Sequence, residues 1–104
     1  MTRISTHVLD TQSGQPATRL AVRLMHADQQ LAAGQTDSDG RWLALDDEQA
    51  TVGDYRLEFE VGEYYAGHSF HPKVCVDFTV AEMAGRYHVP LLLSPFAYTT
   101  YRGS

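Results

Sequence analysis

The most constraining feature of this 104-residue chain is a repeated alternation of apolar and polar side chains. From Tyr55 to Val61 every odd position is apolar and every even position is charged. Successive side chains of a strand point to opposite faces of a sheet, so this run predicts a half-buried antiparallel strand. Similar runs occur at 5–9, 20–25, 29–36, 41–45, 74–80, 87–93 and 96–101. Short strands without a repeat or a linker predict an all-β sandwich of two sheets.

The size and charge of the chain narrow the classes of protein further. A length of 104 residues with 43% apolar side chains is typical of one folded domain, which we expect to span residues 1–104. The net charge of −5 argues against nucleic acid or an anionic membrane as the main partner. The segment Met1–Ile4 lacks a signal core, and no window approaches the ~20 apolar residues that span a bilayer. We therefore expect a soluble, cytoplasmic protein.

The segments between the strands contain turn and helix signals. Asp37–Gly40 is typical of a turn in which Gly40 adopts a positive φ, and this assignment is preferred over a calcium loop. Residues 10–16 and 62–72 are expected to be loops. The one helix that the sequence predicts lies within Asp46–Ala50, with acids at its start and Gly53 at its end.

Most isolated reactive side chains have an ordinary structural interpretation. The single cysteine, Cys75, lies in a strand-like run and is expected to be a buried thiol. His68 and His71 have the H-x-x-H spacing, but this spacing alone in a loop is a weak signal, so no metal site is expected there. No phosphate-binding or dinucleotide-binding motif occurs, so no cofactor is expected.

One strand has two apolar faces. In 87–93 the outward face would contain His88, Pro90 and Leu92, which is too apolar for bulk water, so we expect another subunit to cover it. His7 similarly shares a face with Leu9. The threonine-rich and aromatic run 96–101 indicates that the C-terminus is held in the structure, together with Arg102 and Ser104.

Three groups of segments carry a resemblance to a known family. Ile4–Asp10 followed by Gly14–Ala17 is similar to the amino-terminal signature of the transthyretin-like 5-hydroxyisourate hydrolases. Asp37–Arg41 resembles the turn that presents the arginine of that family. Tyr87–Pro95 and the closing Tyr101–Ser104 resemble its second signature. The resemblance covers nearly the whole chain in order.

The resemblance implies a fold, an assembly and a reaction. The fold would be a sandwich of two four-stranded antiparallel sheets with one short helix. The assembly would be a homotetramer, a dimer of dimers with active sites at the subunit interface along a central channel. The reaction would be hydrolysis of 5-hydroxyisourate in urate degradation. His7, Arg41, His88 and Ser104 would be catalytic, and His7, Arg41, Tyr101 and Arg102 would contact the substrate.

These residue types suit that chemistry. Arg41 can donate paired hydrogen bonds to the oxyanion that water attack creates. One neutral imidazole can take a proton from water while a second protonates the leaving nitrogen, and the sequence leaves open which histidine is the base. Ser104 would orient the water or a histidine. The alternatives are a small-ligand carrier of the transthyretin type, and an accessory module of a larger protein.

Overall fold

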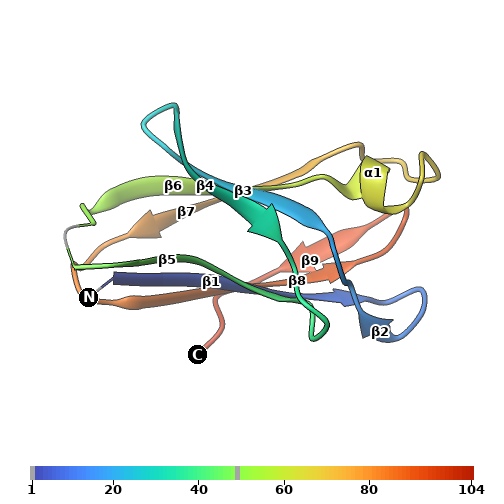
Figure 1. The fold of residues 1–104 in the computed structure, drawn as a ribbon, viewed down its shortest axis with the longest axis horizontal. Helices are drawn as coiled ribbons and strands as arrows, with labels where there is room; N and C mark the ends of the chain where they lie inside the picture. The colour runs from blue at the N-terminus through green and yellow to red at the C-terminus, as the bar shows by residue number, and fades with distance from the viewer. Residues whose placement is uncertain (1, 49) are drawn as a thin grey trace.

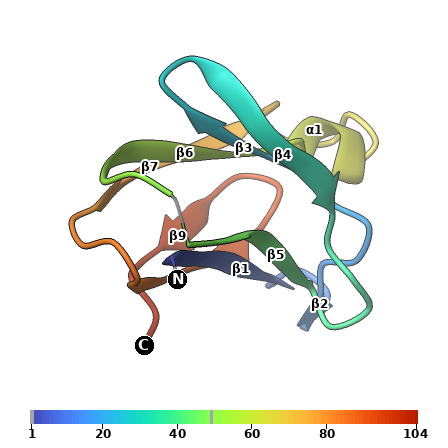
Figure 2. The ribbon, with the colours of Figure 1, turned by 60° about the vertical axis from the view of Figure 1, so that its left-hand side comes forward.

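The computed structural model describes residues 2–48 and 50–104, which form two β-sheets packed face to face (Figures 1 and 2). The strands are β1 Thr2–Asp10, β2 Gln15–Pro16, β3 Ala21–His26, β4 Gln29–Gln35, β5 Arg41–Asp47, β6 Gly53–Phe59, β7 Val74–Val80, β8 Arg86–Leu93 and β9 Tyr98–Thr100, and the helix is α1 Val61–Tyr64. The sandwich predicted from the alternating runs is therefore confirmed. The described residues contain no helix with the length and apolarity needed to cross a bilayer.

One sheet has the order β2-β1-β8-β9, and β5 also pairs with β1; the other has the order β4-β3-β6-β7. β5 pairs with residues 2–7 of β1, and β2 pairs with the last two residues of β1. β2 and β5 therefore lie along the same side of β1, one after the other. The first sheet thus has five strands rather than the expected four, because β2 and β5 pair with different parts of the same side of β1, and the second sheet has four strands as expected. β1 and β8 run parallel, which a connection of this length allows, whereas the other pairs are antiparallel.

The core lies between the sheets and follows the alternation. In β1 the inward side chains Ile4 and Val8 are fully buried, whereas the alternate positions Arg3 and Leu9 are exposed. Leu57 of β6 and Leu91 of β8 are also fully buried in this core. Burial of these side chains fixes the faces of β1 and β8, because a slip of one residue would turn every side chain over. The outward residues of the two strands are therefore fixed as a set.

The expected helix over Asp46–Ala50 is wrong. Asp46 and Asp47 continue β5 and pair with β1, and the Asp46 carboxylate lies 4.0 Å from the Arg3 guanidinium. Gln49 lies outside the described residues, and Gly53 begins β6 rather than ending a helix. The helix instead lies in the long connection after β6. It follows the core residue Phe59 closely and buries Val61.

A buried aspartate connects α1 to the end of β1. The Asp10 carboxylate accepts hydrogen bonds of 3.0 Å from the hydroxyls of both Tyr64 and Tyr65. Burial and this hydrogen bond raise the pKa of Tyr64 to about 12, so the tyrosine stays a donor at any physiological pH. The helix thus caps the end of the sandwich where β1 turns into β2.

The expectation of a buried thiol is also wrong, because Cys75 is exposed. In β7 the residues Val74 and Val80 are buried, and Cys75 belongs to the alternate, exposed set with Asp77 and Thr79. Partial burial, followed by the negative charge of Glu58, raises the pKa of the thiol, so Cys75 does not have the character of an activated nucleophile.

Candidate active site

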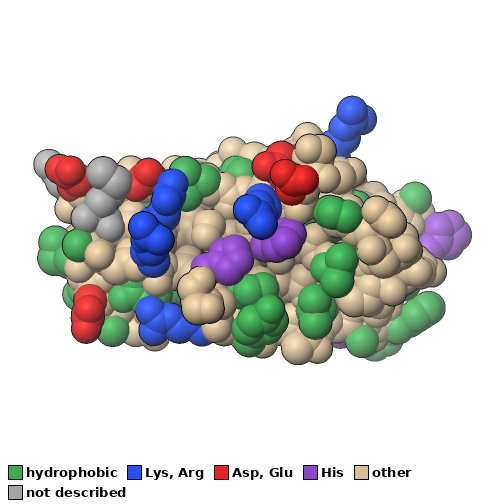
Figure 3. Space-filling view, turned by 90° about the horizontal axis from the view of Figure 1, so that it is seen from below, with side chains coloured by type: hydrophobic (Ala, Val, Ile, Leu, Met, Phe, Trp, Pro, Cys, Tyr) green, Lys and Arg blue, Asp and Glu red, His purple; other side chains and the backbone are tan. Residues whose placement is uncertain are grey.

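Three neighbouring strands bring the polar candidates to one face of the molecule. β1 contributes His7, which is paired in register with Arg41 of β5 and with Pro90 of β8. His88 of β8 is paired with Ser5, two residues before His7, so both histidines point outward from adjacent strands. In Figure 3, histidine side chains lie together near the middle of this face, with a basic side chain against them.

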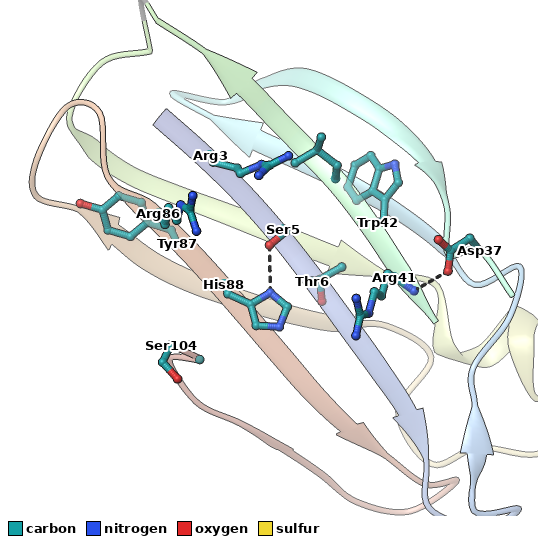
Figure 4. Close-up of a pocket in the computed structure, with 12 residues that line it drawn as sticks. Arg3, Ser5, Thr6, Asp37, Arg41, Trp42, Arg86, Tyr87, His88 and Ser104 are labelled. Carbon is teal, nitrogen blue, oxygen red and sulfur yellow. Dashed lines mark hydrogen bonds between the residues drawn. The ribbon is translucent and has the colours of Figure 1, made fainter. Parts of the chain in front are cut away.

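A cavity of about 460 Å³ opens on this face, and Arg41, His88 and Ser104 contribute to its lining. Figure 4 shows Arg41 on β5 and His88 on β8, with β1 between the two strands, and Ser104 at the end of the tail that returns toward them. His7 is not among the lining side chains, but it lies beside Arg41 in the sheet. The predicted group is therefore brought together, with His7 at the margin of the cavity.

The imidazole of His88 is held from two directions. Its Nδ1 is 2.9 Å from the Ser5 hydroxyl, which leaves Nε2 free for a ligand. Gly103 lies against the ring, since a Cβ built on this glycine would be only 2.5 Å from His88 Cδ2. Only glycine leaves room for the tail and the ring together.

The surroundings of His88 favour its neutral form. Burial lowers the pKa of His88 below the ordinary value, and the positive charges of His7 and Arg41 lower it further. The ring is therefore mainly unprotonated near neutral pH. A neutral imidazole with one free nitrogen can accept a proton.

The turn before β5 orients Arg41. The Asp37 carboxylate accepts backbone N–H bonds of 2.9 Å from both Asp39 and Arg41. The bond from the Arg41 backbone N–H is the main cause of the lowered pKa of Asp37, so this carboxylate stays ionised. Gly40 has a φ of 74°, as the sequence predicts, and a Cβ there would meet the carbonyl oxygen of Val8. The side chain of Arg41 thus begins from a rigid turn.

The C-terminal segment folds back along β8. The Thr100 hydroxyl donates to the Pro90 carbonyl at 2.8 Å, and the Gly103 N–H donates to the His88 carbonyl at 2.8 Å. A Cβ on Gly103 would also lie 3.1 Å from the Pro90 ring. The tail therefore supplies part of the cover that the sequence assigned to another subunit, and it fixes the position of Ser104.

Tyr101 and Arg102 lie on the other side of His88. Both line a second hollow of about 300 Å³, which shares Tyr87 and His88 with the first. The Arg102 guanidinium carbon lies 4.9 Å from the centre of the Tyr87 ring, a cation–π contact that also ties the tail to β8.

The remaining histidines, His26, His68 and His71, do not line this cavity. His71 packs edge-on against Phe70 and Tyr98, with ring centres 4.9 and 5.3 Å apart respectively. Across residues 2–48 and 50–104, no group of three or more His, Cys, Asp or Glu side chains is placed to hold a metal ion.

Sequence reasoning missed two residues that contact His88. Ser5 shares the outward face of β1 with His7, so the alternation alone could have included it. Gly103 was noted only as part of the closing segment. The need for a glycine there follows from the return of the tail onto His88, which no local pattern encodes.

The fold and this face together define a transthyretin-like β-sandwich with a polar site on the outer surface of one sheet. The model of the HIUase/Transthyretin family matches residues 4–103, and the chain belongs to this family. A relative from Caulobacter vibrioides, named 5-hydroxyisourate hydrolase, is 41% identical over the whole of both chains.

Solved structures of similar proteins have the same fold. The structure of Klebsiella pneumoniae 5-hydroxyisourate hydrolase is 33% identical with a TM-score of 0.90, and each chain is fully covered. Transthyretin from Sparus aurata is 34% identical with a TM-score of 0.86, over 96% of this chain and 95% of the other. The family therefore includes proteins with different names on one fold.

Proposed function

We propose that the protein hydrolyses 5-hydroxyisourate to 2-oxo-4-hydroxy-4-carboxy-5-ureidoimidazoline, a step in urate degradation. The observation that carries the proposal is the convergence of Arg41, His88 and Ser104 on one cavity, beside His7. The full-length identity to relatives named 5-hydroxyisourate hydrolase supports the same conclusion. The protein is an enzyme of the hydrolase class.

His88 is the general base in this proposal. The proposal uses the tautomer in which Nδ1–H faces the Ser5 hydroxyl 2.9 Å away, so that Nε2 removes a proton from a water molecule as the water attacks a ring carbonyl. The lowered pKa of His88 supports this choice between the two histidines, because a base must be unprotonated at the working pH. The sequence alone left the choice open.

Arg41 and His7 complete the reaction. Attack of water places negative charge on the carbonyl oxygen, and the Arg41 guanidinium donates hydrogen bonds to it. The acyl C–N bond then breaks, the carbon becomes a carboxylate carbon, and the leaving nitrogen receives a proton from His7. The pairing of His7 with Arg41 on neighbouring strands supports their action on one substrate.

The tail residues would position the reactants. Ser104 orients the attacking water, since this residue lines the same cavity as His88. Tyr101 and Arg102 are proposed to contact the substrate, because the hollow that they line shares His88 with the cavity.

A homotetramer would enclose this open site, in line with the expectation from the sequence. Leu9 and Leu92 are paired in register on the same outer face and remain 37% and 36% exposed, and Phe96, in the connection between β8 and β9, is 75% exposed. Exposed apolar side chains next to a polar site are typical of an interface between subunits. β7 and β9 are also edge strands, which another copy can extend. The cytoplasmic location stays a prediction.

The test is the decay of freshly generated 5-hydroxyisourate, followed by ultraviolet absorbance. Wild-type protein should accelerate the decay strongly, and His7→Ala, Arg41→Gln and His88→Ala should each lose most of the acceleration while keeping the oligomeric state. Decay at the uncatalysed rate with wild-type protein would favour the transthyretin-type carrier instead. The histidines and arginine of the site argue against a carrier of apolar ligands.

A further inference from the structure

Two arginines lie side by side at one end of the cavity. Arg3 of β1 is paired in register with Arg86 of β8, and the two strands are parallel neighbours about 4.8 Å apart. Both side chains line the cavity that contains His88. Figure 4 shows Arg3 and Arg86 at one end and Arg41 at the other, with Ser5 and His88 between them.

This arrangement places like charges together without full compensation. Like charges on neighbouring strands repel each other. Arg3 has one distant acid, with its guanidinium 4.0 Å from Asp46 and about half of its side chain exposed, at 49%. Within the described part of the chain, Arg86 makes no ion pair. The chain carries 13 acids against 8 bases, so its composition does not force two arginines together.

We propose that Arg3 and Arg86 form a cationic rim that captures the anionic form of the substrate, an inference that rests on the proposed function. A flat oxidised purine with several carbonyls ionises readily, and guanidinium forks donate paired hydrogen bonds to such oxygens. Arg3 precedes Ser5 by two residues, about 7 Å along the strand, so an anion at the rim lies one step from His88.

The rim acts on capture rather than on bond breaking. Arg41 contacts the oxygen that gains charge, whereas Arg3 and Arg86 lie at the opposite end of the cavity. Charges at the opening of a site raise the association rate of an opposite charge by about 10- to 10³-fold, and salt screens the effect. The rim should therefore affect kcat/KM and its salt dependence, and leave kcat nearly unchanged.

The experiment compares wild-type protein with the double variant R3Q/R86Q between about 20 and 500 mM KCl. We expect kcat/KM of the double variant to fall about tenfold at low salt, to lose most of its salt dependence, and to keep kcat within about twofold. The double variant R3K/R86K retains the charge and should retain capture. R19Q/K73Q is the control, because it removes the same number of positive charges as R3Q/R86Q, two, from outside the cavity.

A binding measurement separates this inference from the proposed function. Calorimetric titration with urate, a stable purine anion, needs no turnover, and R3Q/R86Q should bind it about tenfold more weakly than wild type at low salt. Unaltered urate affinity together with unaltered salt dependence in R3Q/R86Q would overturn the rim. Failure of wild-type protein to accelerate 5-hydroxyisourate decay would instead overturn the proposed function, and the urate titration would still decide whether the rim binds anions.

Discussion

Replacement of Gly103 by alanine tests the packing of the tail against His88. The added Cβ would lie 2.5 Å from His88 Cδ2, whereas an ordinary contact begins at about 3.4 Å. The ring and the tail must therefore separate by about 0.9 Å, the difference between the two distances. Among the described residues with positive φ, Gly103 does not appear, so its backbone conformation itself permits alanine.

A displacement of this size at a catalytic group lowers the reaction rate. Misplacement of a reacting group by about 1 Å can cost about 10²-fold in rate. We therefore expect Gly103→Ala to slow the hydrolysis reaction about 10²-fold at saturating substrate. Gly103 is the next-to-last residue and is not part of the core, so the melting temperature should change little.

The assay is the ultraviolet decay of 5-hydroxyisourate, with gel filtration and a thermal melt on the same samples. Gly67→Ala is the control, because a Cβ there meets no atom within 4 Å while its φ of +85° opposes a side chain. It should lose about 1 kcal/mol of stability and keep full activity. A Gly103→Ala protein with activity within about threefold of wild type would show that the position of His88 against the tail does not limit catalysis.

Three further changes test other contacts. Ser5→Ala removes the 2.9 Å bond to His88 and should lower kcat about tenfold. Ser5→Thr retains a hydroxyl and should keep most of the activity. Equal kcat values for wild type, Ser5→Ala and Ser5→Thr would exclude positioning of His88 by Ser5. The pKa of His88, titrated by NMR, should lie below 6.5 and should rise in Arg41→Gln, since a positive charge that opposes protonation is lost; an unchanged value would contradict the electrostatic cause. Gly34→Ala should destabilise the fold by about 1 to 3 kcal/mol in a thermal melt, because its Cβ would lie 2.5 Å from Trp42 Nε1, and an unaltered melting temperature would show that the indole can move away.

The strands were predictable because each one buries alternate side chains. The runs at 55–61 and 74–80 correspond to β6 and β7, and the outward positions of His7 and His88 follow from the same period of two. The resemblance to a family was confirmed over residues 4–103. The strand pattern and the family signatures are both contained in short stretches of sequence, so neither requires knowledge of the fold.

Two local signals were misleading for physical reasons. Asp46 and Asp47 suit the start of a helix, but pairing of β5 with β1 outweighs that weak preference. The true helix has four residues, too few to show a helical period, and it includes Gly62, whose N–H donates to the Pro72 carbonyl. Cys75 has an apolar character, but its position in the alternation places it on the outer face.

Contacts between distant segments were beyond the reach of the sequence, and the bond between Ser5 and His88 is the main example. The two residues are 83 positions apart and meet only because β1 and β8 are parallel with one register. The same pairing places Arg3 beside Arg86. Periodicity gives the face of each strand, whereas the register between strands requires the fold.

Pro90 explains why the tail delivers Ser104 to the site instead of ending as a regular strand. The offset that pairs Leu91 with Thr100 also pairs His88 with Gly103, so the tail keeps one register along β8. In an antiparallel pair, every second residue of a strand is hydrogen-bonded to the partner strand. After His88, the next residue of β8 that would donate its N–H to the tail is therefore Pro90. Pro90 has no N–H, so the ladder is interrupted there and the tail is held by the Thr100 hydroxyl on one side and by Gly103 on the other. Tyr101 is therefore not part of the β9–β8 pairing. The pairing of Gly103 with His88 still holds the next residue, Ser104, beside His88.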